Sequence, residues 1–277
     1  MANENRFLFL FTFLRVHSRL KHLARCSVPE RWRPIGYLTH LVRSRCHQRV
    51  RRGPFAGMRY INGSIGSAYL PKLLGTYERE LVSVIEAECV RSPRLIIDLG
   101  AAEGYYAVGL ALRNPGARVV AFERAEAGQI ALLKMAKLNG VPGRLEIRGG
   151  CGPSDLRDLL DSGKDEHPRV ANPNPFILCD VEGDERRLLD PLAVPGLKSA
   201  RILVETHEFI HPGITEQLRE RFAPTHRVEL IWQTSRSRAD FPFSGPGIRL
   251  LPTSYLDWAV SEWRPIRMCW LWLKPHA

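Results

Sequence analysis

The residues that most constrain the fold are 95–104, in which a short apolar run ends in an acid and a glycine-rich turn. An apolar run that contains Ile96 and Ile97 and is followed by turn-forming residues is typical of a buried strand. The next residues, 105–113, contain no proline and end at Asn114-Pro115-Gly116, so they are predicted to form a helix. A strand, a glycine-rich turn and a helix in this order predict the first half of a βαβ nucleotide-binding unit.

The turn also indicates which nucleotide binds. It places Asp98 before Gly100 and Gly104, a spacing that differs from the G-x-G-x-x-G pattern of dinucleotide-binding proteins. Asp98 and Glu103 would repel a pyrophosphate, and no basic residue lies near them in the sequence to offset them. S-adenosylmethionine has no phosphate and carries a sulfonium and an ammonium cation. The acids at this turn therefore favour S-adenosylmethionine as the cofactor.

The rest of the chain continues the alternation of strands and helices. Further strands are predicted at 118–122, 145–148, 176–179, 201–204, 227–232 and 268–273, and helices at 77–90, 129–138, 154–160, 184–189 and 214–222. Glu123, directly after the second strand, lies at roughly the 20-residue offset of an acid that accepts hydrogen bonds from ribose hydroxyls. Residues 53–75 are dense in Gly, Pro and Ser and are predicted to be loop. The long stretch 235–265 is predicted to be an insertion that faces the substrate.

Three segments resemble the class I S-adenosylmethionine-dependent methyltransferases, and more narrowly the FkbM-like O-methyltransferases. They are IIDLGAAEGYYAVGLA at 96–111, VVAFERAE at 119–126 with AKLNG at 136–140, and CDVEGDE at 179–185. The D-x-E-G after a later strand is the part similar to FkbM-like enzymes, and Ala102 stands where many methyltransferases have a second glycine. The resemblance spans roughly residues 77–204. It implies an α/β Rossmann-like fold with a doubly wound, mostly parallel seven-stranded sheet and an antiparallel C-terminal strand.

The charge of the chain is concentrated at one end. The net charge is +11, and residues 1–59 contain thirteen Lys and Arg against two acids, so residues 60–277 are neutral. We predict a basic N-terminal extension at 1–59 and a methyltransferase domain at 60–277. The extension has two interpretations: an amphipathic segment that contacts an anionic membrane, a partner or nucleic acid, or a solvated and only partly ordered tail. The neutral body argues against nucleic acid as a partner.

The six cysteines are scattered and include no C-x-x-C pair. This spacing matches neither a zinc site nor a compact disulfide framework. The cysteine pattern therefore indicates a reducing, cytoplasmic compartment.

In open α/β sheets, ligands bind beyond the carboxyl ends of the strands. Acidic residues follow four of the predicted strands, which points to one site at that edge. The resemblance and these positions assign cofactor binding to Asp98, Gly100, Ala101, Ala102, Gly104, Tyr105, Glu123, Arg124, Cys151 and Asp180.

The predicted catalytic residues are Asp180, Glu182 and His207. Asp180 and Glu182 are two positions apart in an extended stretch, so both side chains point the same way and can position the acceptor or take its proton. Alternatively, Glu182 binds backbone N–H groups of the following turn. His207 has an ordinary pKa of about 6.5, which suits a general base. A divalent metal held by Asp180, Glu205 and His207 is a further alternative that we do not favour.

The predicted function is in-line methyl transfer to a hydroxyl of a small molecule or sugar. One alternative is a nucleic-acid methyltransferase that grips phosphates with the basic segment. Residues 172–176 (NPNPF) do not support it, because an N/D-P-P-Y box would have to follow a strand and this run precedes one. Another alternative is a cofactor-binding module that does not catalyse. Acidic groups of the acceptor would meet Arg236, Arg238 or Arg264 if these arginines are not simply on the surface.

Overall fold

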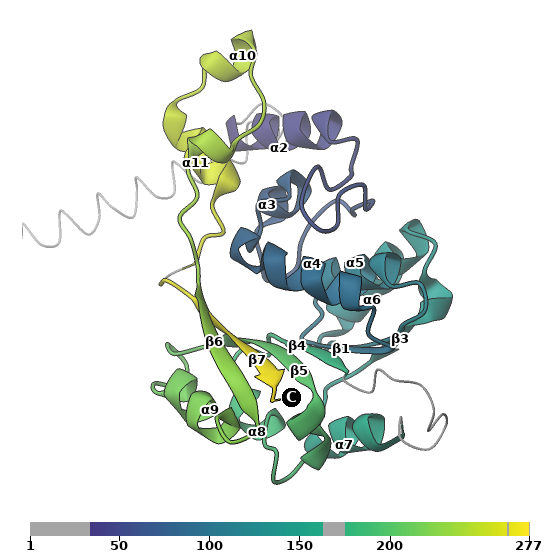
Figure 1. Ribbon diagram of the computed structural model, residues 1–277. Coiled ribbons are helices and arrows are strands. Elements are labelled where there is room, and N and C mark those ends of the chain that lie inside the picture. The colour runs from purple at the N-terminus through teal and green to yellow at the C-terminus, as the bar shows by residue number, and fades with distance from the viewer. Residues whose placement is uncertain (1–33, 163–174, 265, 277) are drawn as a thin grey trace, which may run out of the picture.

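Seven strands form a single sheet in the computed structural model, which describes residues 34–162, 175–264 and 266–276 (Figure 1). The strand order across the sheet is β3-β2-β1-β4-β5-β7-β6. The strands are β1 (Leu95–Leu99), β2 (Arg118–Phe122), β3 (Leu145–Arg148), β4 (Phe176–Cys179), β5 (Arg201–Thr206), β6 (His226–Trp232) and β7 (Cys269–Pro275).

All neighbouring strands from β3 to β5 pair in parallel, whereas β7 pairs antiparallel with both β5 and β6. The C-terminal strand is therefore the one that runs against the others. The chain order reverses between β1 and β4, which is the place where doubly wound sheets open a crevice for a ligand. The predicted fold, a Rossmann-like and mostly parallel seven-stranded sheet with an antiparallel C-terminal strand, is confirmed.

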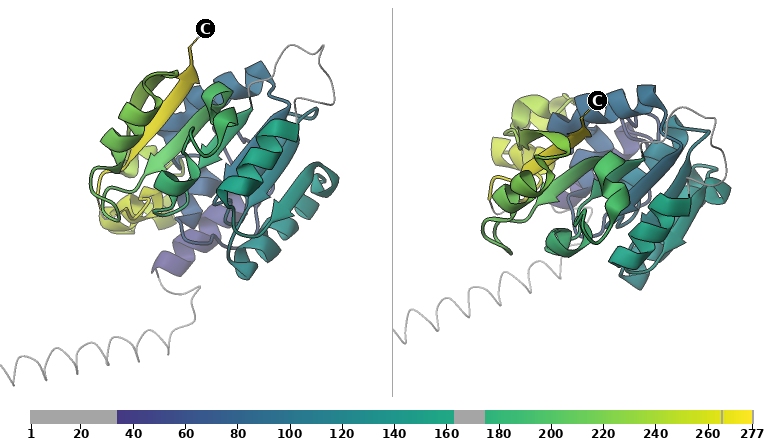
Figure 2. Two further views of the ribbon diagram at one scale, coloured as in Figure 1. Left: turned by 90° about the horizontal axis from the view of Figure 1, so that it is seen from below. Right: turned by 60° about the horizontal axis from the view of Figure 1, so that its bottom comes forward.

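Helices cover both faces of the sheet (Figures 1 and 2). One face carries α4 (Val82–Arg91), α5 (Tyr105–Arg113) and α6 (Glu126–Leu138), and the other carries α7 (Pro153–Ser162), α8 (Glu185–Leu188) and α9 (Ile214–Phe222). Successive strand residues point to opposite faces, so Ile96 packs in the core under α4–α6 while Ile97 and Leu99 pack in the core over α7–α9. Both cores are apolar, which explains why the central strands have no polar alternation.

A helical lobe extends beyond one edge of this sandwich (Figure 1). It consists of α2 (Pro34–Arg45), α3 (Tyr69–Leu74), α10 (Pro246–Arg249) and α11 (Thr253–Val260), and α2, α3 and α11 contact one another. Leu38 and Val42 of α2 are fully buried in the same core as α4–α6. The described part of the basic segment, from residue 34, thus packs onto the domain. The boundary at residue 59 stays a prediction, and residues 1–33 lie outside the described residues.

The structure corrects two expected elements. The range 53–75 contains helix α3 and is not only loop: Pro71 lies within the helix, and Gly75 ends it in a left-handed conformation (φ 71°). The helix expected at 77–90 begins later, with a 3₁₀ turn at Arg79–Leu81 before α4, because Glu78 has a left-handed backbone (φ 44°). Glu78 is held in this conformation by a buried ion pair with Arg264, a contact between residues distant in the sequence.

No helix among the described residues is long and apolar enough to cross a membrane. Five cysteines in the described ranges are free thiols, namely Cys46, Cys89, Cys151, Cys179 and Cys269. The cytoplasmic compartment stays a prediction. Most of the NPNPF run, residues 172–174, lies outside the described residues.

Candidate active site

A cavity of about 600 Å³ opens at the carboxyl ends of β1, β2, β4 and β5. Segments 65–77 and 262–268, which lead into the helical lobe, complete its wall. The predicted site residues that line it are Asp98, Gly100, Ala101, Ala102, Tyr105, Glu123, Arg124, Cys151, Asp180, Glu182 and His207. Gly104 does not line the cavity. It precedes α5, and a Cβ atom there would lie 2.2 Å from Leu132, so packing requires a glycine at this position. Its part in cofactor binding stays a prediction.

Gly100 is required by the approach of two strands. A Cβ atom at Gly100 would lie 1.8 Å from the backbone oxygen of Asp180, and Gly100 has a φ of 86°. Two residues later Ala102 also adopts a left-handed conformation, with a φ of 47°. Ala102 thus stands at a position whose backbone favours glycine, the residue that many methyltransferases have there. The tight turn presents its backbone to the cavity.

Asp98 is the most unusual acid of the site. It is 1% exposed, and neither carboxylate oxygen accepts a hydrogen bond of ordinary geometry within the described chain. Burial, followed by the charges of Asp180 and Glu123, raises the pKa of Asp98 to about 7. A carboxylate in this state is stabilised by a ligand that brings a positive charge.

Glu103 has the opposite environment, and it corrects the expectation that no base offsets the acids of the turn. Its carboxylate accepts hydrogen bonds from Lys72 Nζ at 2.5 Å, from Ser64 Oγ at 2.6 Å and from the backbone of Ile65 at 2.9 Å. Burial opposes ionisation, but Lys72 and the hydroxyl donors lower the pKa of Glu103 to about 2. Lys72 comes from α3, which the sequence did not show to be near the turn. Glu103 therefore ties segment 64–72 to the cofactor turn.

Glu123 is held in place by the backbone around it. Its carboxylate accepts hydrogen bonds from the backbone N–H groups of Ala102 at 2.8 Å and Ala125 at 2.7 Å. Nearby, the side chain of Arg124 is 79% exposed and lies 3.6 Å from Asp184. Cys151 also lines the cavity, and burial raises the pKa of its thiol to about 12, so it is a neutral contact and not a nucleophile.

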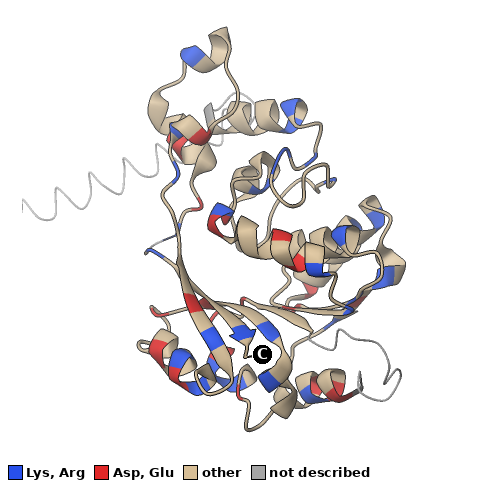
Figure 3. Cartoon of the chain, in the orientation of Figure 1, with Lys and Arg blue, Asp and Glu red and all other residues tan. Residues whose placement is uncertain are grey.

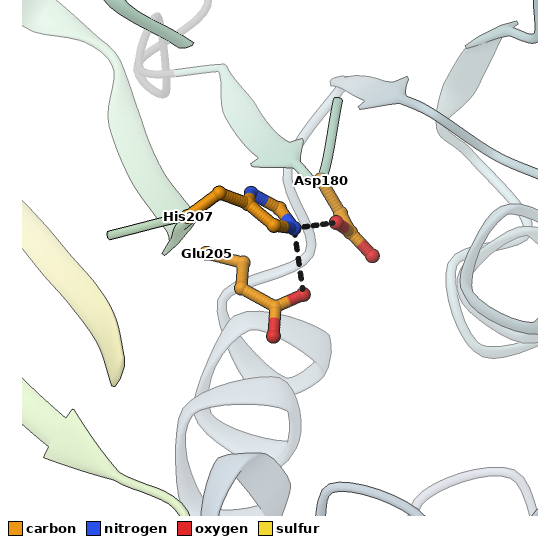
Figure 4. A group of neighbouring side chains, drawn as sticks. All are labelled: Asp180, Glu205 and His207. Atoms are coloured by element: carbon orange, nitrogen blue, oxygen red, sulfur yellow. Dashed lines mark ion pairs between the residues drawn. The ribbon is translucent and has the colours of Figure 1, made fainter. Parts of the chain in front are cut away.

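The ends of β4 and β5 bring His207 next to Asp180 and Glu205 (Figure 4), and helix α8 adds Glu185. His207 Nδ1 lies 2.6 Å from Glu185 Oε1, and Nε2 lies 3.4 Å from Asp180 Oδ1. Burial alone would lower the pKa of His207, but the hydrogen bond to Glu185 and the charge of Asp180 raise it. Glu185 was not among the predicted site residues. The sequence shows it only as an acid at a helix start, and its role depends on its contact with His207.

Glu182 is exposed in the wall of the cavity and has a φ of 49°. The alternative that Glu182 binds the turn before α8 is not supported, because the backbone of Gly183 donates to Glu185, at 3.0 Å. The part of Glu182 in catalysis stays a prediction.

Asp180, Glu205 and His207 offer three possible metal-binding atoms within 4.8 Å of one another. However, Arg264 forms an ion pair with Glu205 at the same place. Burial and the neighbouring Asp180 raise the pKa of Glu205 although Arg264 opposes the shift. A guanidinium beside one of three donors repels a divalent cation and occupies a carboxylate oxygen. Asp180, Glu205 and His207 therefore suit the guanidinium of Arg264, which already pairs with Glu205, better than a metal ion.

The arginines expected to hold an acidic group of the acceptor have other partners. Arg264 pairs with Glu78, Glu205 and Glu262. Arg236 pairs with Glu80 at 2.8 Å and with Glu262 at 2.6 Å, and its side chain is 3% exposed. Arg238 is exposed outside the cavity. The contacts of these arginines give no support to an anion contact, because acids of the chain already pair with Arg236 and Arg264.

No family model matches the chain, and no curated protein matches it. Among solved structures, one that it resembles is the O-methyltransferase TomG of Streptomyces achromogenes, crystallised with S-adenosylmethionine: 15% identity over 68% of this chain and 77% of that one, with a TM-score of 0.44. Another is an O-methyltransferase of Bacillus cereus in complex with S-adenosylhomocysteine, which is 17% identical over 68% of this chain and 78% of that one, with a TM-score of 0.41. A third is the C-terminal domain of precorrin-6Y C5,15-methyltransferase from Rhodobacter capsulatus, which is 14% identical over 70% of this chain and 87% of that one, with a TM-score of 0.43.

Proposed function

We propose that this protein is an S-adenosylmethionine-dependent methyltransferase that acts on a hydroxyl of a small molecule or sugar. The observation that carries the proposal is Asp98, a buried carboxylate in the cavity wall whose oxygens accept no hydrogen bond of ordinary geometry in the described chain. Such a group is costly to bury, and a cation relieves the cost. The ammonium group of S-adenosylmethionine is such a cation, and the molecule has no phosphate that the acids would repel.

The remaining residues of the turn fit the same ligand. Each oxygen of Glu123 accepts one backbone hydrogen bond and keeps a further lone pair, so the carboxylate can also accept hydrogen bonds from ribose hydroxyls. Lys72 does not attract a phosphate, because Glu103 neutralises it. We propose that Tyr105, Arg124 and Cys151 complete the cofactor wall.

When bound, S-adenosylmethionine supplies an electrophilic methyl group on a sulfonium that is already a good leaving group. We propose that His207 Nε2 takes the proton of the acceptor hydroxyl, while Glu185 keeps the other ring nitrogen protonated. Asp180, 3.4 Å from Nε2, would orient the same hydroxyl. Positioning can supply up to about 7–11 kcal/mol of the barrier, and a general base adds roughly 10²–10⁴-fold.

The Asp180-Val181-Glu182-Gly183 motif supports a narrower proposal, an FkbM-like O-methyltransferase. The described residues give no support to a nucleic-acid methyltransferase: α9, for example, mixes acidic and basic residues (Figure 3), where a phosphate grip would need a basic stripe. The pairing of His207 with Glu185 disfavours a non-catalytic module, since a site that only binds needs no base.

Calorimetry at several pH values tests the cofactor assignment. Asp98 gains its charge as the pH rises through about 7, so we expect the affinity for S-adenosylmethionine to increase between pH 6 and pH 8. Asp98→Asn should weaken binding at pH 8 roughly tenfold or more and remove this pH dependence. Glu220→Gln, an exposed acid on α9, is the matched control. Binding of NAD in place of S-adenosylmethionine would contradict the proposal.

A further inference from the structure

The cavity as a whole has more acidic than basic side chains in its wall. Seven carboxylates line the cavity against three lysines and arginines: Asp98, Glu123, Asp180, Glu182, Asp184, Glu205 and Glu262 against Lys72, Arg124 and Arg264. Each of the three cations is paired with an acid of the chain. His207, the remaining group that can carry a positive charge, lies between Glu185 and Asp180. The two buried cations of the described cavity, Lys72 and Arg264, are therefore held by acids of the chain and are not free to hold an anionic acceptor.

Two large aromatic side chains are exposed in the same cavity wall. Phe209 is 52% exposed and Trp263 is 58% exposed, although most large apolar side chains of the described chain are buried. The Phe209 ring lies 5.7 Å from the ring of His207, the proposed base. A ring compound on Phe209 would thus have its substituents within reach of His207.

Trp263 also has a strained backbone. Its φ is 61°, a left-handed conformation that bulky residues rarely adopt. The ring packs edge-on against Trp258 at 5.2 Å, and the backbone N–H donates to Ser261 Oγ at 3.1 Å. Strain of this kind persists only where neighbouring contacts enforce it, and it is frequent at ligand clamps.

We propose that Phe209 and Trp263 form the platform for the acceptor, and that this acceptor is a ring-bearing hydroxyl compound without negative charge. The proposal rests on the proposed methyl transfer and adds the substrate class to it. Exposed aromatic faces bind the apolar faces of rings, while the surrounding carboxylates accept hydrogen bonds from hydroxyls and repel acids.

Matched acceptor pairs test the charge selection with the full-length chain and labelled S-adenosylmethionine. Each pair shares one ring and differs by a carboxylate: catechol and 3,4-dihydroxybenzoate, and methyl glucoside and methyl glucuronide. We expect kcat/KM for the uncharged member of at least one pair to exceed that of the acid by about tenfold or more, because the acid would lie within a few ångströms of fixed carboxylates. Equal rates, a preference for the acids, or no transfer to either pair would overturn the proposal.

Variants test the platform. Trp263→Ala and Phe209→Ala should each raise KM for the uncharged acceptor about tenfold and leave the dissociation constant of S-adenosylmethionine unchanged. Trp232→Ala is the matched control, since Trp232 is 44% exposed on β6 and lies outside the cavity. Glu182→Lys should reduce the ratio of kcat/KM for the uncharged acceptor to kcat/KM for the acidic acceptor. An unchanged KM in both platform variants would refute the assignment. If the unmodified protein did not bind S-adenosylmethionine, that result would instead refute the proposed function.

Discussion

One buried contact decides the chemistry of His207. Glu185 is fully buried and its carboxylate lies 2.6 Å from Nδ1, so Nε2 is the nitrogen that faces Asp180 in the cavity. Because a carboxylate at this distance favours the protonated ring, it raises the pKa of His207 above its ordinary value of 6.5 against the effect of burial. As the proposed base, His207 is active only when deprotonated, so we expect the rate to rise with pH through that raised pKa.

Replacement of Glu185 therefore changes the pH profile as well as the rate. In Glu185→Gln the charge that raises the pKa of His207 is absent, so we expect the rising limb of kcat to move to lower pH. We also expect kcat to fall about tenfold or more, because the ring nitrogen is no longer fixed. Steady-state rates between pH 5 and pH 9 measure both effects. An unchanged profile would show that His207 is not the base.

Asp98 and Glu103 show what the sequence can and cannot indicate about a single residue. They are five positions apart in the same turn, yet their pKa values move in opposite directions, to about 7 and about 2. The sequence indicates that both are at the cofactor turn. Only the fold brings Lys72 to Glu103, because α3 is distant from the turn in the chain, whereas Asp98 accepts no hydrogen bond of ordinary geometry from the described residues.

At the scale of elements, the site depends on how closely the ends of β1 and β4 approach. The backbone of Asp180 donates to Leu99 at 2.8 Å, which brings the carbonyl group of Asp180 against Gly100. This contact places Asp98 and Asp180 in the wall of one cavity, where the charge of Asp180 helps to raise the pKa of Asp98.

A single added methyl group tests this approach. Gly100→Ala should lower the free energy of unfolding by about 3 kcal/mol, because a Cβ atom would lie 1.8 Å from a backbone oxygen and the φ of 86° is unfavourable for alanine. Gly116→Ala is the control: no atom lies within 4 Å of its Cβ position, so a change within about 0.5 kcal/mol is expected. Thermal denaturation of both variants measures the difference. Equal stability would show that β1 and β4 separate easily.

Elements with a strong local pattern could be predicted well. Strands β2, β3 and β4 and helices α5 and α9 have the predicted bounds, since each apolar run is bordered by turn residues or acids. Helix α3 could not be predicted, because its Pro71 and its neighbouring glycines are also typical of loops. Its helical state depends on burial of Leu73 and Leu74 against the rest of the domain.

At the scale of the whole molecule, buried ion pairs beside the cavity join segments that are more than 100 residues apart in the sequence. Arg236 bridges Glu80, just before α4, and Glu262, just after α11. Arg264 bridges Glu78 and Glu205 in the same way. Residues 262–264 of the stretch 235–265 line the cavity, and Arg236 and Arg264 hold this part of the wall through buried ion pairs. That the stretch faces the substrate stays a prediction.

Removal of one partner should show the strength of this connection. Arg236→Ala leaves the buried carboxylate of Glu80 without its cation and Glu262 with Arg264 alone, so we expect a loss of about 3–5 kcal/mol in the free energy of unfolding. Arg118→Ala is the control, because its ion pair with Glu146 is half-exposed and should contribute less than about 1 kcal/mol. Chemical denaturation compares the two. A similar loss in both variants would mean that the buried network does not stabilise the lobe.

The sequence by itself determined the order of strands and helices, the edge of the sheet at which the site lies, and the acids that follow its strands. These properties depend on local patterns of apolar, turn-forming and acidic residues, which act over a few positions of the chain. The tertiary structure alone decided that Glu103 is paired with Lys72, while Asp98 accepts no hydrogen bond of ordinary geometry from the described residues. It also decided that Glu185 holds His207 and that Arg264 lies where a metal ion was an alternative. Charge and hydrogen bonding depend on distances in space, and residues separated by tens or hundreds of positions make those contacts.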